Sequence, residues 1–174
     1  MLSKSDLMFS LIKLNWDNAE ENFENLLSSM NRQGTFFFDK DFILKTALVW
    51  SGRGAKYEVA KFKGTEGEKT LEYIKDIWPK FEASFRWLQD FLDYSRITSD
   101  SILPSYNALI PIIVFVGIHD CKVNSPKVKN NMQTWLYRTL LNGNFSGQAD
   151  RVIDNTKVVL MTNPNPDYFP YKEL

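Results

Sequence analysis

The chain has 174 residues, with 21 basic and 21 acidic side chains. A net charge of zero argues against a protein that coats nucleic acid or membrane with its whole surface, because such partners select a basic excess. One cysteine cannot form an internal disulfide, and one cysteine with one histidine cannot supply the three or four ligands of a structural zinc site. The length and a 44% hydrophobic content predict one globular domain in a reducing, cytoplasmic setting.

Apolar residues recur at helical spacing from the start of the chain, and strand-like alternation is hard to find. Residues 7–14 and 23–30 predict two short helices that are joined by a tight turn. Asp39 or Asp41 can cap a third helix, which ends at the glycine-containing residues 51–54.

A long amphipathic helix is predicted after a loop at residues 55–67. Its apolar positions step alternately by three and four residues from Leu71 to Leu92, as expected for one buried stripe of a helix. Pro79 lies inside this pattern and removes one backbone hydrogen bond. We therefore expect either a kink near residues 76–79 or a break into two helices.

Three more helices are predicted in the remaining chain. The uncharged residues 101–118 contain two prolines, which favours a buried core helix, capped by Ser105 and ending near Gly117, over a membrane span. Residues 126–143 contain a helix that opens with proline and closes with glycine, and residues 147–161 form the last helix.

These patterns together predict an all-α fold, an irregular bundle of about six or seven helices. Residues 1–163 form a single helical domain in this prediction. Two prolines and three Asn or Asp residues after residue 161 favour turns, so we expect residues 164–174 to form an irregular tail on the surface or leading elsewhere.

Few motifs point to chemistry. Residues 64–70 resemble a phosphate-binding loop, but their glycine spacing is wrong, and we interpret them as the start of a helix. His119, Asp120 and Cys121 offer ligands or a nucleophile, yet adjacent side chains rarely converge on one atom, which favours a helix end passing into a loop. We therefore predict no catalytic residue, no metal site and no cofactor, with an enzyme that uses His119 or Cys121 as an alternative.

The charges are unevenly placed although they sum to zero. Residues 17–24 contain four acids and no base, whereas residues 121–149 contain basic and aromatic side chains and no acid. Such a mixture is suited to contact with a phosphate backbone, and the simpler interpretation is an ordinary solvated face. The candidate residues for contact with the DNA backbone are Lys122, Lys127, Lys129 and Arg138.

Four segments in chain order resemble consecutive motifs of one bacterial family. We call them the landmark segments: residues 2–10 (LSKSDLMFS), 38–48 (FDKDFILKTAL), 103–111 (LPSYNALIP) and 135–148 (WLYRTLLNGNFSGQ). The family is a domain of unknown function represented by the N-terminal GmrS half of GmrSD-type modification-dependent restriction endonucleases. The resemblance spans nearly the whole chain.

Members of that family begin with a ParB/sulfiredoxin-like domain whose Asp-Gly-Gln-Gln-Arg motif is associated with nucleotide hydrolysis, and many end with a His-Asn-His-type nuclease. This sequence contains no such motif and only one histidine. The resemblance therefore implies a noncatalytic helical scaffold domain of a phage-defence protein, which couples a nucleotide-hydrolysing core to a nuclease. Its implied partners are those other domains and, through residues 121–149, DNA, with no membrane partner.

The resemblance also implies roles for individual residues. Ser5 and Asp6 would directly follow the nucleotide-handling core, which makes them nucleotide-proximal candidates, and a capping box of Ser3 with Asp6 accounts for them equally well. Ser105 and Asn107 suit an N-cap and a buried polar tie. The residues of the later landmark segments with an implied structural role are Pro104, Ser105, Tyr106, Asn107, Trp135, Phe145, Ser146 and Gln148.

The alternative function is a stand-alone helical protein–protein interaction domain. Its partner would dock on aromatic side chains that the sequence places in loops or in the tail, where exposure is expected. These aromatic residues are Phe36, Phe37, Tyr168, Phe169 and Tyr171.

Overall fold

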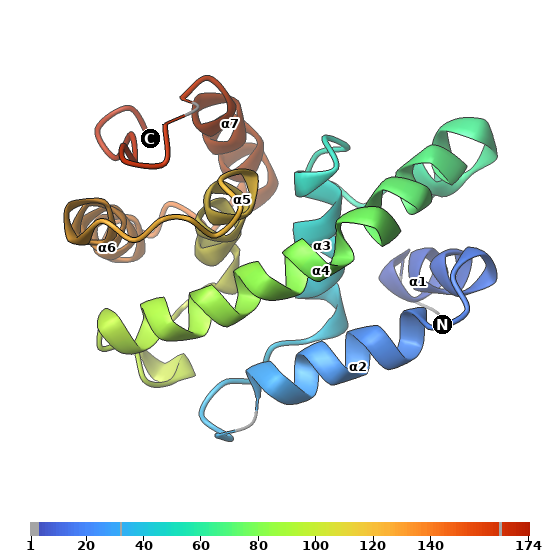
Figure 1. Ribbon diagram of the computed structural model, residues 1–174, viewed down its shortest axis with the longest axis horizontal. Coiled ribbons are helices and arrows are strands. Elements are labelled where there is room, and N and C mark those ends of the chain that lie inside the picture. Colours follow the sequence, from blue (N-terminus) through green and yellow to red (C-terminus); the bar gives the residue numbers. More distant parts are fainter. Residues whose placement is uncertain (1–3, 32, 164) are drawn as a thin grey trace.

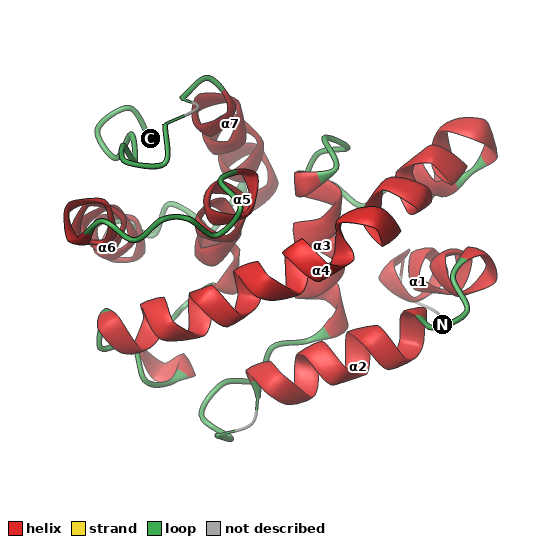
Figure 2. Ribbon diagram, viewed as in Figure 1, coloured by secondary structure: helices red, strands yellow, loops and turns green. Residues whose placement is uncertain are grey.

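The computed structural model describes residues 4–31, 33–163 and 165–174. Within these residues the chain forms α-helices and short 3-10 helices and no strand (Figure 2), which confirms the predicted all-α fold. The seven α-helices are α1 (Lys4–Asn15), α2 (Ala19–Met30), α3 (Lys40–Trp50), α4 (Gly64–Tyr94), α5 (Ile110–Ile118), α6 (Pro126–Leu141) and α7 (Ala149–Met161). The 3-10 helices are η1 (Val59–Phe62), η2 (Asp100–Ile102) and η3 (Tyr106–Leu109).

Helix α4 crosses the whole molecule. It has 31 residues and is therefore about 46 Å long. Figure 1 shows α1 and α2 on one side of it and α5, α6 and α7 on the other, and α4 contacts α1, α2 and α5. Pro79 lies within this single helix, so the alternative of a break into two helices is wrong.

The start of α4 differs from the sequence pattern. The helix begins at Gly64, in agreement with the interpretation of residues 64–70 as a helix start, so residues 64–67 of the expected loop are helical. Gly67 lets the first turn lie directly on the backbone of Phe62. A Cβ atom at Gly67 would lie 2.1 Å from the carbonyl carbon of Phe62. An apolar periodicity cannot detect such packing, since a glycine contributes no apolar side chain.

Helix α5 lies at the centre of the core. All its residues from Ile110 to Gly117 are buried, which confirms the interpretation of this uncharged run as a core helix. A Cβ atom on Gly117 would lie 1.6 Å from the Trp50 ring, so this glycine allows α3 and α5 to pack closely. None of the described helices is long and apolar enough to cross a membrane.

The C-terminal segment is irregular, but it is not confined to the surface. Phe169 is fully buried and packs edge-on against Phe115 of α5 and Trp135 of α6, with ring centroids 5.1 and 5.7 Å apart. The expectation that Phe169 is an exposed docking residue is therefore wrong. Its neighbour Tyr168 is 38% exposed.

Candidate functional site

The landmark segments lie far apart in the sequence, yet three of them are joined by ring contacts. The ammonium of Lys40, in the second segment, lies 5.0 Å from the ring centroid of Phe9 in the first. The ring of Phe38, also in the second segment, stacks on Tyr106 of the third at 4.3 Å. These contacts connect α1, α3 and η3 through aromatic faces.

The third and fourth landmark segments line one pocket, which we call the landmark pocket. Its volume is about 230 Å³. Trp135 of α6 and Phe145 of the loop after α6 are both buried. Their rings pack edge to face with centroids 6.4 Å apart. The lining residues of the landmark pocket are Pro104, Ser105, Thr139, Leu140, Gly143, Phe145, Ser146 and Gly147.

Ser105 is an N-cap, but it caps η3 and not α5, which follows η3 directly and has no side-chain cap. The Ser105 Oγ accepts a hydrogen bond from the backbone N–H of Asn107 at 3.3 Å. The tie to another element is made by Tyr106 and not by the Asn107 side chain. The Tyr106 hydroxyl accepts a hydrogen bond from Phe37 N at 2.9 Å and donates one to the Asp100 carboxylate. Burial, followed by the hydrogen bond to Asp100, raises the pKa of Tyr106.

Ser146 and Gln148 of the fourth segment are on the surface, whereas Thr139 is buried. The Ser146 hydroxyl donates to Gly143 O at 2.5 Å and thereby closes the turn after α6. Gln148 is the exposed residue before α7, and its side chain makes no cap, although its carbonyl accepts from Val152 N at 3.1 Å. Both residues therefore shape the connection between α6 and α7.

The nucleotide-proximal candidates lie at the start of α1. Ser5 is buried, whereas Asp6 is exposed and its carbonyl accepts a hydrogen bond from Ser10 Oγ at 2.8 Å. Ser3, the other member of the expected capping box, lies outside the described residues. Figure 1 shows α1 on the opposite side of the molecule from α6, so Ser5 and Asp6 are remote from the basic residues of α6.

Three of the four DNA-backbone candidates are exposed. Lys127 and Arg138 are eleven residues apart on α6, which places them on the same side of the helix about 16 Å apart. Lys122 precedes α6 in the loop after α5. The three charges therefore do not form a compact cluster.

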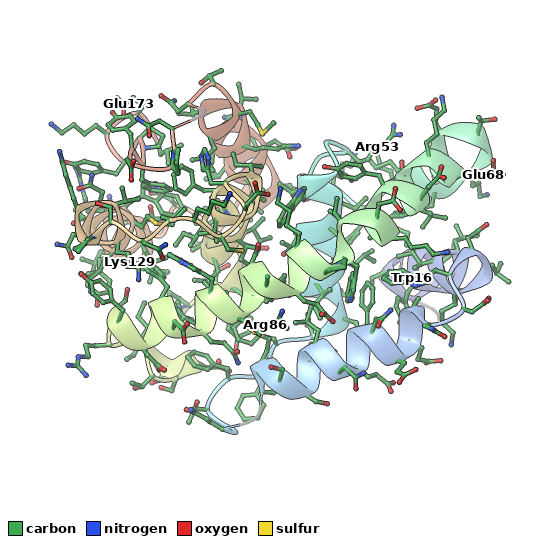
Figure 3. All side chains as sticks on the ribbon, viewed as in Figure 1. Trp16, Arg53, Glu68, Arg86, Lys129 and Glu173 are labelled. Atoms are coloured by element: carbon green, nitrogen blue, oxygen red, sulfur yellow. The ribbon has the colours of Figure 1, made fainter. Side chains whose placement is uncertain are left out.

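Lys129 differs from the other candidates, because α4 covers part of it. Figure 3 labels Lys129 on α6. Its ammonium lies 5.6 Å from the ring centroid of Trp87 and 5.9 Å from that of Tyr94. Two cation–π contacts at these distances hold the charge against α4. The structure thus divides the basic stretch into an exposed part and a residue that joins two helices.

The tripeptide His119-Asp120-Cys121 forms a tight turn after α5, as expected. Asp120 and Cys121 both have positive φ angles, 54° and 58°. Their side chains diverge, since the Asp120 carboxylate pairs with Lys80 Nζ at 2.5 Å and Cys121 Sγ lies 3.5 Å from Ser84 Oγ. Residues 4–31, 33–163 and 165–174 contain no group of three or more side chains suited to hold a metal ion.

His119, the first residue of the tripeptide, is half-buried. The His119 imidazole lies edge-on to Phe115, with centroids 4.6 Å apart, and its Nε2 atom is buried without a hydrogen-bond partner among the described residues. Burial, followed by the charge of Lys80, lowers the pKa of His119, although the Asp120 carboxylate opposes this effect. Burial therefore favours the neutral form of this imidazole over the charged form.

One ion pair that involves the second landmark segment was not predicted from the sequence. Lys45 of α3 pairs with Asp150 of α7 at 2.8 Å, and the Lys45 side chain is only 17% exposed. Tyr57 lies beside this pair, where its hydroxyl donates to Asp41 O. Burial, followed by the nearby Asp41 charge, raises the pKa of Tyr57. A single lysine and a single aspartate 105 residues apart give no local signal for such a contact.

The site is thus a set of packed segments with polar residues at their rim. No protein-family model and no curated protein matches the chain.

Proposed function

We propose that this chain is a noncatalytic helical scaffold domain of a cytoplasmic, restriction-endonuclease-like phage-defence protein. In this proposal it couples a nucleotide-hydrolysing core to a nuclease and holds the two at a fixed distance. The observation that supports the proposal is the mutual contact of the landmark segments. Segments that pack on one another through side-chain contacts serve the interior of a domain, whereas catalytic groups converge on a substrate.

The proposal has a direct biochemical test. The isolated chain is expected to hydrolyse neither GTP nor ATP and to leave DNA uncut. Catalysis by this chain would contradict the scaffold role. If such activity also disappeared in Cys121→Ala or His119→Ala and survived in Ser84→Ala, the tripeptide enzyme would be the better account.

A second part of the proposal is weak contact with the DNA backbone through the exposed charges of residues 121–149. Each neutralised phosphate contributes about −0.9 to the slope of log K against log salt concentration. Lys122, Lys127 and Arg138 together would give a slope of about −3 if each contacts one phosphate. Such binding is strongest at low salt and independent of base sequence.

A gel-shift titration across salt concentration tests this contact. The double variant Lys127→Gln with Arg138→Gln is expected to weaken binding and to reduce the slope by about 2. A matched control is Lys63→Gln with Lys75→Gln, since both lysines are exposed and lie elsewhere in the chain. Absence of binding at low salt, or equal loss in the control, would remove DNA from the proposal.

The alternative, a stand-alone interaction domain, is favoured by one observation. Phe37 is 69% exposed, the largest exposure among the aromatic residues of the proposed docking surface. Phe36 and Tyr171 are partly buried, however, and Phe169 belongs to the core. The predicted aromatic docking surface is therefore reduced mainly to Phe37 and Tyr168.

A further inference from the structure

The landmark pocket lies where η3 meets α6 and α7, and η3 contacts both of these helices. Helix α6 contributes Thr139 and Leu140 to the lining, the loop after α6 contributes Phe145, and the segment before η3 contributes Pro104. The described lining residues include no charged side chain. A ligand that fits this lining is therefore neutral.

The described ranges of the chain end far from this pocket. Lys4 begins α1 and Asn31 follows α2, and Figure 1 shows α1 and α2 on the other side of α4 from α6. Asn163 lies beyond the end of α7, whereas the pocket adjoins the start of that helix at Ala149, about 20 Å away along its axis. The pocket is thus built within the continuous range 33–163.

Thr139 differs from other helical threonines, because its hydroxyl makes no hydrogen bond with a described residue. Four threonines in other helical positions each donate to the carbonyl oxygen four residues earlier, at 2.7–2.8 Å: Thr46, Thr70, Thr134 and Thr156. Thr139 is nevertheless only 3% exposed. A buried hydroxyl without a partner costs stability, so a ligand that bonds it gains binding energy.

The Thr139 hydroxyl opens into the pocket. The polar side-chain atoms that are fully enclosed without a partner in the described chain are Thr35 Oγ1, Ser95 Oγ and His119 Nε2, and Thr139 Oγ1 is not one of them. This oxygen therefore keeps access to solvent. Because the rest of Thr139 is buried and the residue lines the pocket, that access leads through the pocket.

The other two hydroxyls of the lining already serve the backbone. Ser105 Oγ accepts from Asn107 N at 3.3 Å, and Ser146 Oγ donates to Gly143 O at 2.5 Å. Thr139 is thus the one hydroxyl of the described lining that is left for a ligand.

The walls around this hydroxyl are apolar. Phe145 is 6% exposed, and its ring is held edge to face against Trp135. Leu140 is half-buried, and Pro104 is exposed at the rim. Such walls favour an aromatic ring, which packs well against the edge or face of another ring.

We propose that the landmark pocket binds a small neutral phenol, with the ring against Phe145, Leu140 and Pro104 and the hydroxyl bonded to Thr139 Oγ1. A phenol has one polar atom, which matches the one uncommitted hydroxyl, whereas a nucleobase or a sugar would bury several polar groups without partners. A cavity of about 150 Å³ binds benzene in another protein, so about 230 Å³ also accommodates a para substituent. Free phenols and the tyrosine side chain of a partner share this chemistry. The inference goes beyond the scaffold role and is independent of it.

An NMR titration with 4-methylphenol tests the inference. We expect saturable shifts of the Thr139 and Leu140 methyl groups, with Kd of about 1 mM for so small a ligand. Thr139→Val keeps the shape of the side chain and removes the hydroxyl. It is expected to weaken binding of 4-methylphenol about fivefold and to leave binding of toluene, which has no hydroxyl, unchanged.

Thr134→Val is the matched control. It makes the same substitution on α6, but Thr134 is exposed and lies on a different side of the helix. It is expected to leave the binding of both ligands unchanged. The unliganded Thr139→Val protein should melt no lower than the wild type, because the lost hydroxyl has no partner in the described chain.

Two peptides distinguish the sources of the phenol. If acetyl-Gly-Tyr-Gly-amide binds and Thr139→Val weakens it, the ligand is a tyrosine of a protein partner; if 4-methylphenol alone binds, the ligand is a free phenol. Equal binding of the tyrosine peptide and its phenylalanine counterpart would contradict the hydroxyl contact.

Four further results would overturn the inference. They are the absence of saturable shifts with 4-methylphenol, an equal effect of Thr139→Val on 4-methylphenol and toluene, an equal effect of Thr134→Val and Thr139→Val, and a lower Tm of unliganded Thr139→Val. The last result would mean that the hydroxyl already has a structural partner.

Discussion

Removing the ring of Phe169 tests whether the irregular C-terminal segment belongs to the core. This residue follows a turn-rich stretch, yet its side chain is fully buried. It packs on Phe115 of α5 and Trp135 of α6, on the far side of α4 from α2 (Figure 1). Phe169→Ala would leave a cavity between these rings.

The magnitude follows from the buried ring. A phenylalanine buries roughly 150–200 Å², and at about 25 cal/mol per Å² this corresponds to about 4–5 kcal/mol. Alanine retains part of this contact while the cavity adds a cost, so we expect a loss of about 3–5 kcal/mol. For a chain of this length the corresponding decrease in Tm is roughly 6–20 °C.

Urea denaturation followed by circular dichroism measures this loss. Tyr168→Ala is the matched control, because Tyr168 is 38% exposed and bonds only Glu173 among the described residues, so its loss should stay below about 1 kcal/mol. Phe169→Leu should lie between the two variants. If Phe169→Ala destabilised the protein no more than Tyr168→Ala does, the C-terminal segment would not be part of the core.

Three further changes probe other features of the fold. Gly117→Ala should cost about 3 kcal/mol or more in thermal or urea unfolding, because its Cβ would collide with Trp50, whereas Gly147→Ala, which meets nothing within 4 Å, should cost little. Asp39→Ala should destabilise α3 by about 1 kcal/mol in the same assay, since the Asp39 carboxylate caps its first turn. The lowered pKa of His119 means that the folded state binds fewer protons than the unfolded state, so the free energy of unfolding should decrease as pH falls below about 6.5. His119→Gln should remove that part of the pH dependence, and an imidazole that titrates normally by NMR would contradict the assignment.

The helices were predictable because their apolar residues recur at helical spacing in the sequence. The three-and-four stepping from Leu71 to Leu92 identifies the core stripe of α4, and Asp39 marks the start of α3 by the chemistry of its cap. Residues 64–70 could be interpreted as the start of α4, but the close packing of Gly67 on Phe62 was not predicted. Local patterns therefore predict helices, whereas close backbone approach is invisible to them.

The arrangement of the site was less predictable, since it depends on contacts between distant segments. Ser105 could be identified as a cap from its place before a helix, but the stacking of Tyr106 on Phe38 joins residues 68 positions apart. The Lys129 ammonium lies against α4 because that helix places the rings of Trp87 and Tyr94 beside it. An isolated aromatic such as Phe169 in a turn-rich tail carries no sign of its burial.

The length of α4 has a consequence for how the molecule opens. A continuous helix that touches α1 and α2 as well as α5 makes the two sides of the protein share one hydrogen-bonded rod. Unfolding the centre of α4 would remove contacts of α1 and α2 as well as contacts of α5, so the unfolding of these helices is thermodynamically coupled. Amide protons in α2 and α5 should then exchange through the same global opening.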